Sequence, residues 1–136
     1  MDTIFSQLYL PAVFVSAVAY FLIGALWYSP LLFAKQWIAA LDLKPEDIQS
    51  SPVVYISTFI GILIIVFILA VLVILINTNT LLGGMFVGAI AGVGFVLTTT
   101  AINNLYAGRS LTLTLVTSGY HIAGFIVSGI ILAKWK

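Results

Sequence analysis

The sequence contains no cysteine, and only 7% of its residues carry a charge. The absence of cysteine excludes disulfides, thiolate metal sites, iron–sulfur clusters and a cysteine nucleophile. Five basic and four acidic residues leave a net charge of +1, so there is no basic patch with which to bind nucleic acid. A soluble domain has about 25% charged residues. Composition therefore excludes a soluble globular protein, a disordered protein and a nucleic-acid-binding protein.

The motifs of common catalytic sites are missing as well. We find no phosphate-binding Walker loop, no Gly-x-Ser-x-Gly elbow, no His-Glu-x-x-His pair and no glycine-rich dinucleotide fingerprint. The single histidine of the chain cannot form a metal site alone, because such a site needs several ligands. We therefore expect no cofactor and no metal ion, and no enzymatic activity unless the single histidine acts as a base within the membrane.

The sequence is instead rich in apolar side chains. Hydrophobic residues make up 62% of the 136 residues and the mean hydropathy is +1.24, so lipid is the expected solvent for most of the chain. The longest uncharged stretch, 48–108, exceeds the roughly 20 residues of one span and is divided by the polar turn 77–80. A β-barrel would need alternating apolar and polar residues, which most of the chain lacks. We predict a single all-α membrane domain over residues 1–136, with four transmembrane helices at about 10–33, 53–76, 81–106 and 111–133.

The segment 34–50, between the first and second spans, is expected to lie on the membrane surface. Pro30 has no backbone N–H, so the first helix should kink or break there. The apolar residues that follow share one helical face, as in an interfacial helix: Phe33, Ala34, Trp37, Ile38 and Leu41. An even number of spans places both termini on one side. We expect a multi-pass protein of the cell inner membrane.

Three glycines in the third span suggest close helix packing. Gly84, Gly88 and Gly92 are four residues apart and form a groove that another backbone can approach. This groove could hold another helix of the same chain, or it could be the seam of a homo-oligomer. The motif does not separate these two interpretations.

His121 is the one ionisable residue deep within a predicted span. Such a residue is a candidate site for a ligand or a proton, although a neutral histidine that is hydrogen-bonded within the bundle is the simpler interpretation. Thr117 lies one turn earlier, and Thr99 and Asn103 are expected to continue the glycine face of the third span. These residues are the candidate partners of His121, and Tyr20 of the first span is a further one.

Two further candidate sites lie near the membrane surface. Arg109 precedes Ser110, a predicted helix N-cap, and together they could bind an anion or a lipid headgroup. The alternative is that Arg109 clamps the last carbonyls of the third span. The stretch Trp27, Tyr28, Ser29 and Pro30 could line a pocket mouth at a broken helix, or it could serve as an interface anchor.

Several stretches together resemble a known family. They are residues 24–33, from Gly24 to Phe33, residues 98–106, the triplet Gly108-Arg109-Ser110, and the pair Gly119-Tyr120. Their order and spacing resemble the small bacterial integral membrane proteins catalogued as domain of unknown function 1761. The resemblance implies a four-span inner-membrane protein. It implies no activity, substrate or cofactor.

Two functions of different classes follow from these observations. The first is a non-enzymatic structural or accessory protein that acts through helix packing or oligomerisation. The alternative is an oligomeric small transporter or channel for a neutral solute or an ion, with a site near His121. Membrane lipids are the expected partners in both cases, with a homo-oligomer or a larger membrane complex as further partners.

Overall fold

The protein is built of helices. A computed structural model describes residues 1–135, in which four helices are long and apolar enough to cross a membrane, as predicted. In chain order the elements are α1 (Asp2–Ser6), α2 (Leu10–Trp27), α3 (Ala34–Leu41), the 3₁₀ turn η1 (Pro45–Asp47), α4 (Pro52–Ile76), α5 (Leu81–Ala91), the π-helical segment η2 (Gly92–Leu97), α6 (Thr98–Tyr106) and α7 (Leu111–Lys134). The segments α5, η2 and α6 form one continuous span, Leu81–Tyr106. No strand occurs within residues 1–135, so the all-α prediction is confirmed.

Three of the four spans have N-terminal or C-terminal caps that explain their bounds. Ser51, Thr80 and Ser110 precede α4, α5 and α7, and each side chain accepts a hydrogen bond from a backbone N–H of the first helical turn. Asn77 ends α4 in the left-handed conformation, with φ of +57°. The turn 77–80 therefore stops one helix and starts the next, as its polar composition predicts.

The first span ends earlier than expected. Helix α2 stops at Trp27 and not near residue 33, because Pro30 cannot donate a hydrogen bond and disfavours helical geometry in the residue before it. The Ser29 hydroxyl donates instead to the carbonyl of Leu26, at 2.6 Å. The backbone N–H of Phe33 then reaches the Trp27 carbonyl, at 3.0 Å, and turns the chain toward α3.

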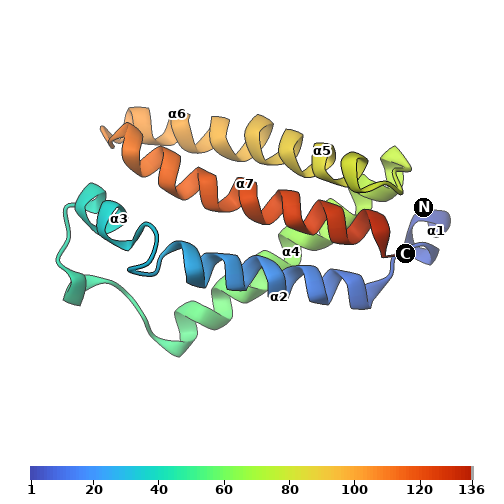
Figure 1. Cartoon of the computed structure of the whole chain (residues 1–136), viewed down its shortest axis with the longest axis horizontal. Coiled ribbons are helices and arrows are strands. Elements are labelled where there is room, and N and C mark those ends of the chain that lie inside the picture. Colours follow the sequence, from blue (N-terminus) through green and yellow to red (C-terminus); the bar gives the residue numbers. More distant parts are fainter. Residues whose placement is uncertain (136) are drawn as a thin grey trace.

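Helix α7 is the central element of the bundle. It packs against α2 on one side and against α5 and η2 on the other, and it also contacts α4 and α3 (Figure 1). The apolar stretch of α7 that could cross a membrane is 44% buried, whereas the corresponding stretch of each other span is 28% buried. The core of the chain is therefore organised around the last of its four spans.

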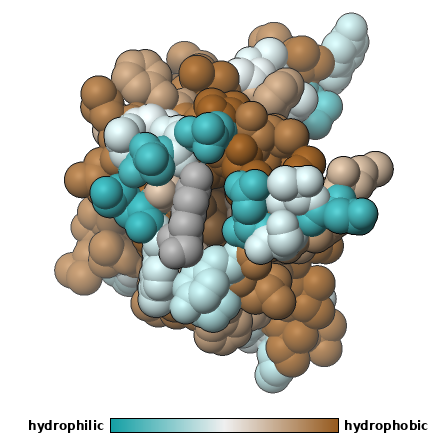
Figure 2. Space-filling model, turned by 90° about the vertical axis from the view of Figure 1, so that its right-hand side faces the viewer, coloured by the Kyte–Doolittle hydropathy of each residue, from teal (hydrophilic) through white to brown (hydrophobic). Residues whose placement is uncertain are grey.

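Both chain ends lie at the same end of the bundle, opposite α3 (Figure 1). Viewed from the end that holds the termini, hydrophilic residues gather in the middle of the face and apolar side chains surround them (Figure 2). This is the pattern expected of a helix bundle whose ends meet water while its sides meet lipid. Helix α3, at the opposite end of the bundle, contacts α7.

The third span contains a π-helical segment that sequence patterns did not reveal. Over Gly92–Leu97 the hydrogen bonds run from residue i to residue i+5, and the Thr98 hydroxyl also donates to the Val93 carbonyl five residues earlier, at 3.1 Å. Each wide turn of this kind adds one residue relative to an α-helix. The side chains of α6 are therefore rotated about the helix axis from the positions that a regular α-helix would give them.

Candidate functional site

A tyrosine and the single histidine meet in the middle of the bundle. The Tyr20 hydroxyl of α2 lies 2.6 Å from Nδ1 of His121 on α7. Tyr20 is fully buried, at 0% exposure, whereas His121 keeps part of its surface exposed. This hydrogen bond joins residues that are 101 positions apart in the sequence. We refer to the two residues as the Tyr20–His121 pair.

Two glycines make room for the aromatic rings around this pair. A Cβ at Gly124 would lie 2.6 Å from the Tyr20 ring, and a Cβ at Gly24 would lie 2.9 Å from the ring of Tyr120. Tyr20 and Tyr120 therefore meet edge to face, with ring centroids 5.4 Å apart, in a favourable aromatic geometry. The Tyr120 ring also lies beside His121, at a centroid distance of 4.6 Å.

Trp27 and Tyr28 extend this aromatic packing toward the end of α2. The indole N–H of Trp27 donates to the carbonyl of Val116 at 2.9 Å, and the indole occupies the space above Gly119. Tyr28 lies between the rings of Tyr120, at 5.5 Å, and Trp37 of α3, at 4.9 Å. The side chains of Trp27 and Tyr28 therefore both pack against α7. Ser29 and Pro30 lie just beyond the end of α2, as described above.

The remaining partners suggested for His121 lie elsewhere. Thr117 is partly buried on α7, one turn before His121. Thr99 and Asn103 are exposed, and the Thr99 hydroxyl donates to the carbonyl of Phe95 in its own helix, at 2.6 Å. The structure therefore brings Tyr20 to His121, and it brings neither Thr99 nor Asn103.

The π-helical segment explains why these two residues are displaced. Steps of three or four residues from Gly92 lead to Thr99 and Asn103, but the extra residue of η2 moves the inner face one position along the chain. Asn104 now lies on that face, and its side-chain amide donates to the Thr114 hydroxyl of α7 at 2.8 Å. A regular helical period could not have identified Asn104.

The glycines of the third span face α7. A Cβ at each position would meet this helix: the Gly129 carbonyl at Gly84, the Phe125 carbonyl at Gly88, and Cα of Ile122, 3.0 Å away, at Gly92. The first two contacts are with backbone, which cannot rotate aside. Helices α5 and α7 thus approach each other more closely than helices with larger residues could.

Arg109 lies in a compact turn between α6 and α7. Gly108 adopts a left-handed conformation with φ of +67°, its N–H reaches the Leu105 carbonyl at 3.3 Å, and the N–H of Arg109 reaches the Asn104 carbonyl at 2.8 Å. These two bonds form a Schellman motif. The backbone of Arg109 thus satisfies a carbonyl at the end of α6, while its side chain is exposed beside the N-cap Ser110.

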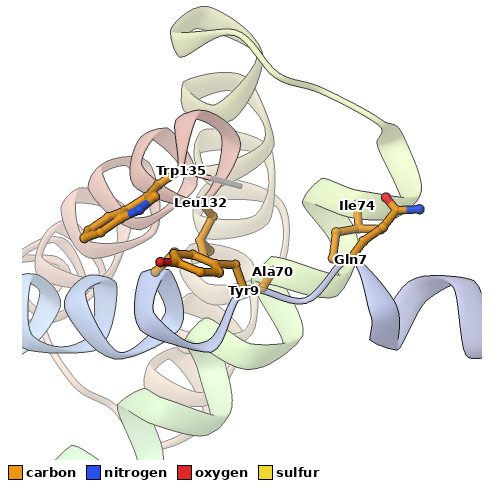
Figure 3. A pocket seen from close by; sticks show the side chains of 7 residues that line it. Gln7, Tyr9, Ala70, Ile74, Leu132 and Trp135 are labelled. Carbon is orange, nitrogen blue, oxygen red and sulfur yellow. The ribbon is translucent and has the colours of Figure 1, made fainter.

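The cavities near the chain ends and along the bundle side are small or apolar. One, of about 10 Å³, lies where the chain ends meet α4 and has room for about one water molecule (Figure 3). Its lining includes Tyr9 and Trp135, whose rings lie 6.0 Å apart. A groove of about 420 Å³ lies between α2 and α4 and is lined by apolar side chains and Tyr55. Within residues 1–135 no three His, Cys, Asp or Glu side chains gather as a metal site would require.

Comparison with known proteins identifies one family. The model of a protein family described as protein of unknown function (DUF1761) matches residues 11–133, which include all four spans apart from their outermost residues. This match confirms the resemblance drawn from residues 24–33 and 98–106. Neither the curated proteins nor the solved structures give a match.

Proposed function

Because the chain belongs to the DUF1761 family, whose function is unknown, we propose that it is a multi-pass protein of the inner membrane that acts by packing against other membrane proteins or a second copy of itself. In this proposal it has no enzymatic activity. The observation that carries the proposal is the tight packing of α5 on α7 through Gly84 and Gly88. Backbone contact between these two spans leaves no open pathway between them, which supports a role in packing.

The surface proposed for the partner is the outward face of the third span. Because Gly84 and Gly88 are used within the chain, a partner would need another surface. Phe86, Ile90 and Phe95 are each more than half exposed, and a Cβ at the neighbouring Gly94 would meet nothing within 4 Å. This face offers large side chains around a small residue, which suits packing by another helix.

Cross-linking in native membranes tests this proposal. Since the chain has no cysteine, a single cysteine at Ile90 or Phe95 gives an unambiguous cross-link, and one at the fully buried Val66 is the matched control. We expect a discrete cross-linked dimer or a defined larger complex from the first two positions and none from the third. A strict monomer by cross-linking, and by native mass spectrometry in lipid nanodiscs, would refute the proposal.

The Tyr20–His121 pair favours a second candidate function. Here the protein binds a small neutral solute or an ion within the membrane and works as an oligomer. The supporting observation is a histidine within a span, only partly buried, whose imidazole makes one hydrogen bond. The test compares His121→Leu with wild-type protein in proteoliposomes. Uptake or binding should disappear in the variant, while the folded bundle should persist with a loss of about 1–3 kcal/mol in stability, because the buried Tyr20 hydroxyl loses its acceptor.

A further inference from the structure

We propose that His121 presents its Nε2–H as a hydrogen-bond donor to an uncharged carbonyl compound dissolved in the membrane. This inference rests on the second candidate function, in which the Tyr20–His121 pair is a binding site, and it specifies the class of ligand. It follows from the hydrogen-bonding capacity of the two side chains, from the depth of His121 in the bilayer and from the partial exposure of this residue.

The burial of Tyr20 determines which atom carries the histidine proton. Within residues 1–135 the Tyr20 hydroxyl has one hydrogen-bond partner, Nδ1 of His121. If Nδ1–H were the donor, the hydroxyl proton of a fully buried tyrosine would have no acceptor, which costs about 1–3 kcal/mol. If Tyr20 donates, both groups are satisfied. A neutral imidazole carries one N–H, so its proton is then on Nε2.

The same assignment excludes a metal ion or another cation as the ligand of this site. The lone pair of Nδ1 accepts the Tyr20 hydroxyl, and a protonated Nε2 has no lone pair to offer. No cluster of three His, Cys, Asp or Glu side chains in the described part of the chain could compensate. The ligand of Nε2–H must therefore be a hydrogen-bond acceptor.

The depth of His121 indicates an uncharged acceptor. His121 lies ten residues into α7, which corresponds to about 15 Å from the start of the helix and to the middle of the span. A charged ligand would be costly at this depth. A carbonyl oxygen on an apolar molecule is uncharged, accepts hydrogen bonds and is soluble in hydrocarbon. A free carbonyl compound, such as a quinone, can reach this depth, whereas the ester groups of phospholipids lie at the edge of the roughly 30 Å hydrocarbon core. The lipid ester is therefore the alternative source that the experiment must exclude.

Nitrogen-15 spectroscopy tests the inference directly, because the chain has a single histidine and every imidazole signal comes from His121. The protein would be purified with a histidine-free tag and placed in nanodiscs of diether phospholipid, which contain no carbonyl group. We expect a protonated Nε2 and an unprotonated Nδ1. A protonated Nδ1 would overturn the inference without any variant being made.

Two comparisons identify the acceptor. A decyl-substituted benzoquinone should shift the Nε2–H signal saturably, whereas decylbenzene, which has no acceptor, should not. The second comparison uses nanodiscs of diester phospholipid. If the Nε2–H signal shifts in these nanodiscs without added quinone, the lipid ester is the source of the carbonyl oxygen. If neither the quinone nor the ester lipid shifts the signal, the carbonyl assignment is wrong.

Matched variants separate the ligand class from the existence of the site. Tyr20→Phe removes the hydroxyl that fixes the tautomer and should weaken the quinone response roughly threefold. Tyr120→Phe removes a neighbouring hydroxyl that is not bonded to His121 and should leave the response unchanged. If His121→Leu abolishes solute uptake while no carbonyl compound shifts the wild-type signal, the site exists but takes another ligand. If His121→Leu changes nothing, the binding site itself is refuted.

Discussion

Replacing Gly88 with alanine should destabilise the protein, although alanine is the better helix former. The new Cβ would meet the backbone of α7, with the Phe125 carbonyl carbon at 2.6 Å and Cα of Ile126 at 2.8 Å, both well inside ordinary contact distance. A backbone cannot move aside as a side chain can, so α5 and α7 must separate. Their neighbouring contact between Gly84 and Gly129 would loosen with them.

The expected size of this effect follows from two opposing terms. Forcing an extra carbon into a packed core costs about 1–3 kcal/mol, and contact with backbone favours the upper end of this range. Replacing glycine by alanine within a helix stabilises by about 1 kcal/mol. The net expectation for Gly88→Ala is a loss of about 2 kcal/mol in the free energy of unfolding.

Gly61→Ala is the matched control for this prediction. Gly61 lies in α4, and a Cβ there would meet nothing within 4 Å. Only the helix-forming term remains, so Gly61→Ala should raise the free energy of unfolding by about 1 kcal/mol at most. Both variants would be compared with wild type by reversible unfolding in mixed micelles. If Gly88→Ala is as stable as Gly61→Ala, the close contact between α5 and α7 does not exist.

Three further predictions concern other parts of the chain. Ser110→Ala should lower the free energy of unfolding by about 1 kcal/mol because it removes the N-cap of α7, and Ser110→Asp should restore most of the loss; equal stability of all three proteins would contradict the cap. Ser118→Ala should be neutral or slightly stabilising in the same assay, because the buried Ser118 hydroxyl has no hydrogen-bond partner within residues 1–135; a loss above about 1 kcal/mol would reveal a missed partner. Single cysteines at Asp2 and Thr78 should react with an impermeant thiol reagent from one side of the membrane, and one at Asp47 should react from the other. Labelling of all three from a single side would overturn the four-span topology.

The number and approximate position of the spans could be predicted because they depend on composition. A run of apolar residues needs no partner to be stable in lipid, so the gaps between charges were sufficient. The end of the first span was harder to predict. Residues 28–33 are apolar enough to extend the helix, but the local effect of Pro30 and the hydroxyl of Ser29 end it at Trp27.

The site was less predictable because its geometry depends on how the helices pack and on a local departure from α-helical geometry. Neither can be derived from the regular spacing of residues along one helix. His121 was singled out as the one ionisable group within a span, but its partner Tyr20 lies on another helix, and only the packing of α2 on α7 brings them together. The choice of Thr99 and Asn103 assumed a regular helix. One extra residue in η2 places Asn104 on the inner face instead.

The central position of α7 has a consequence for biosynthesis. Helix α5 packs mainly on α7, and α2 and α4 also contact it, yet α7 is the last of the four spans to be translated. At about 5–20 residues per second, the 24 residues of α7 take roughly 1–5 s to synthesise. During that interval the third span has been translated but its principal neighbour, α7, has not. A membrane chaperone or insertase that shields small-residue faces would act on this chain at the moment when Gly84 and Gly88 are still exposed to lipid.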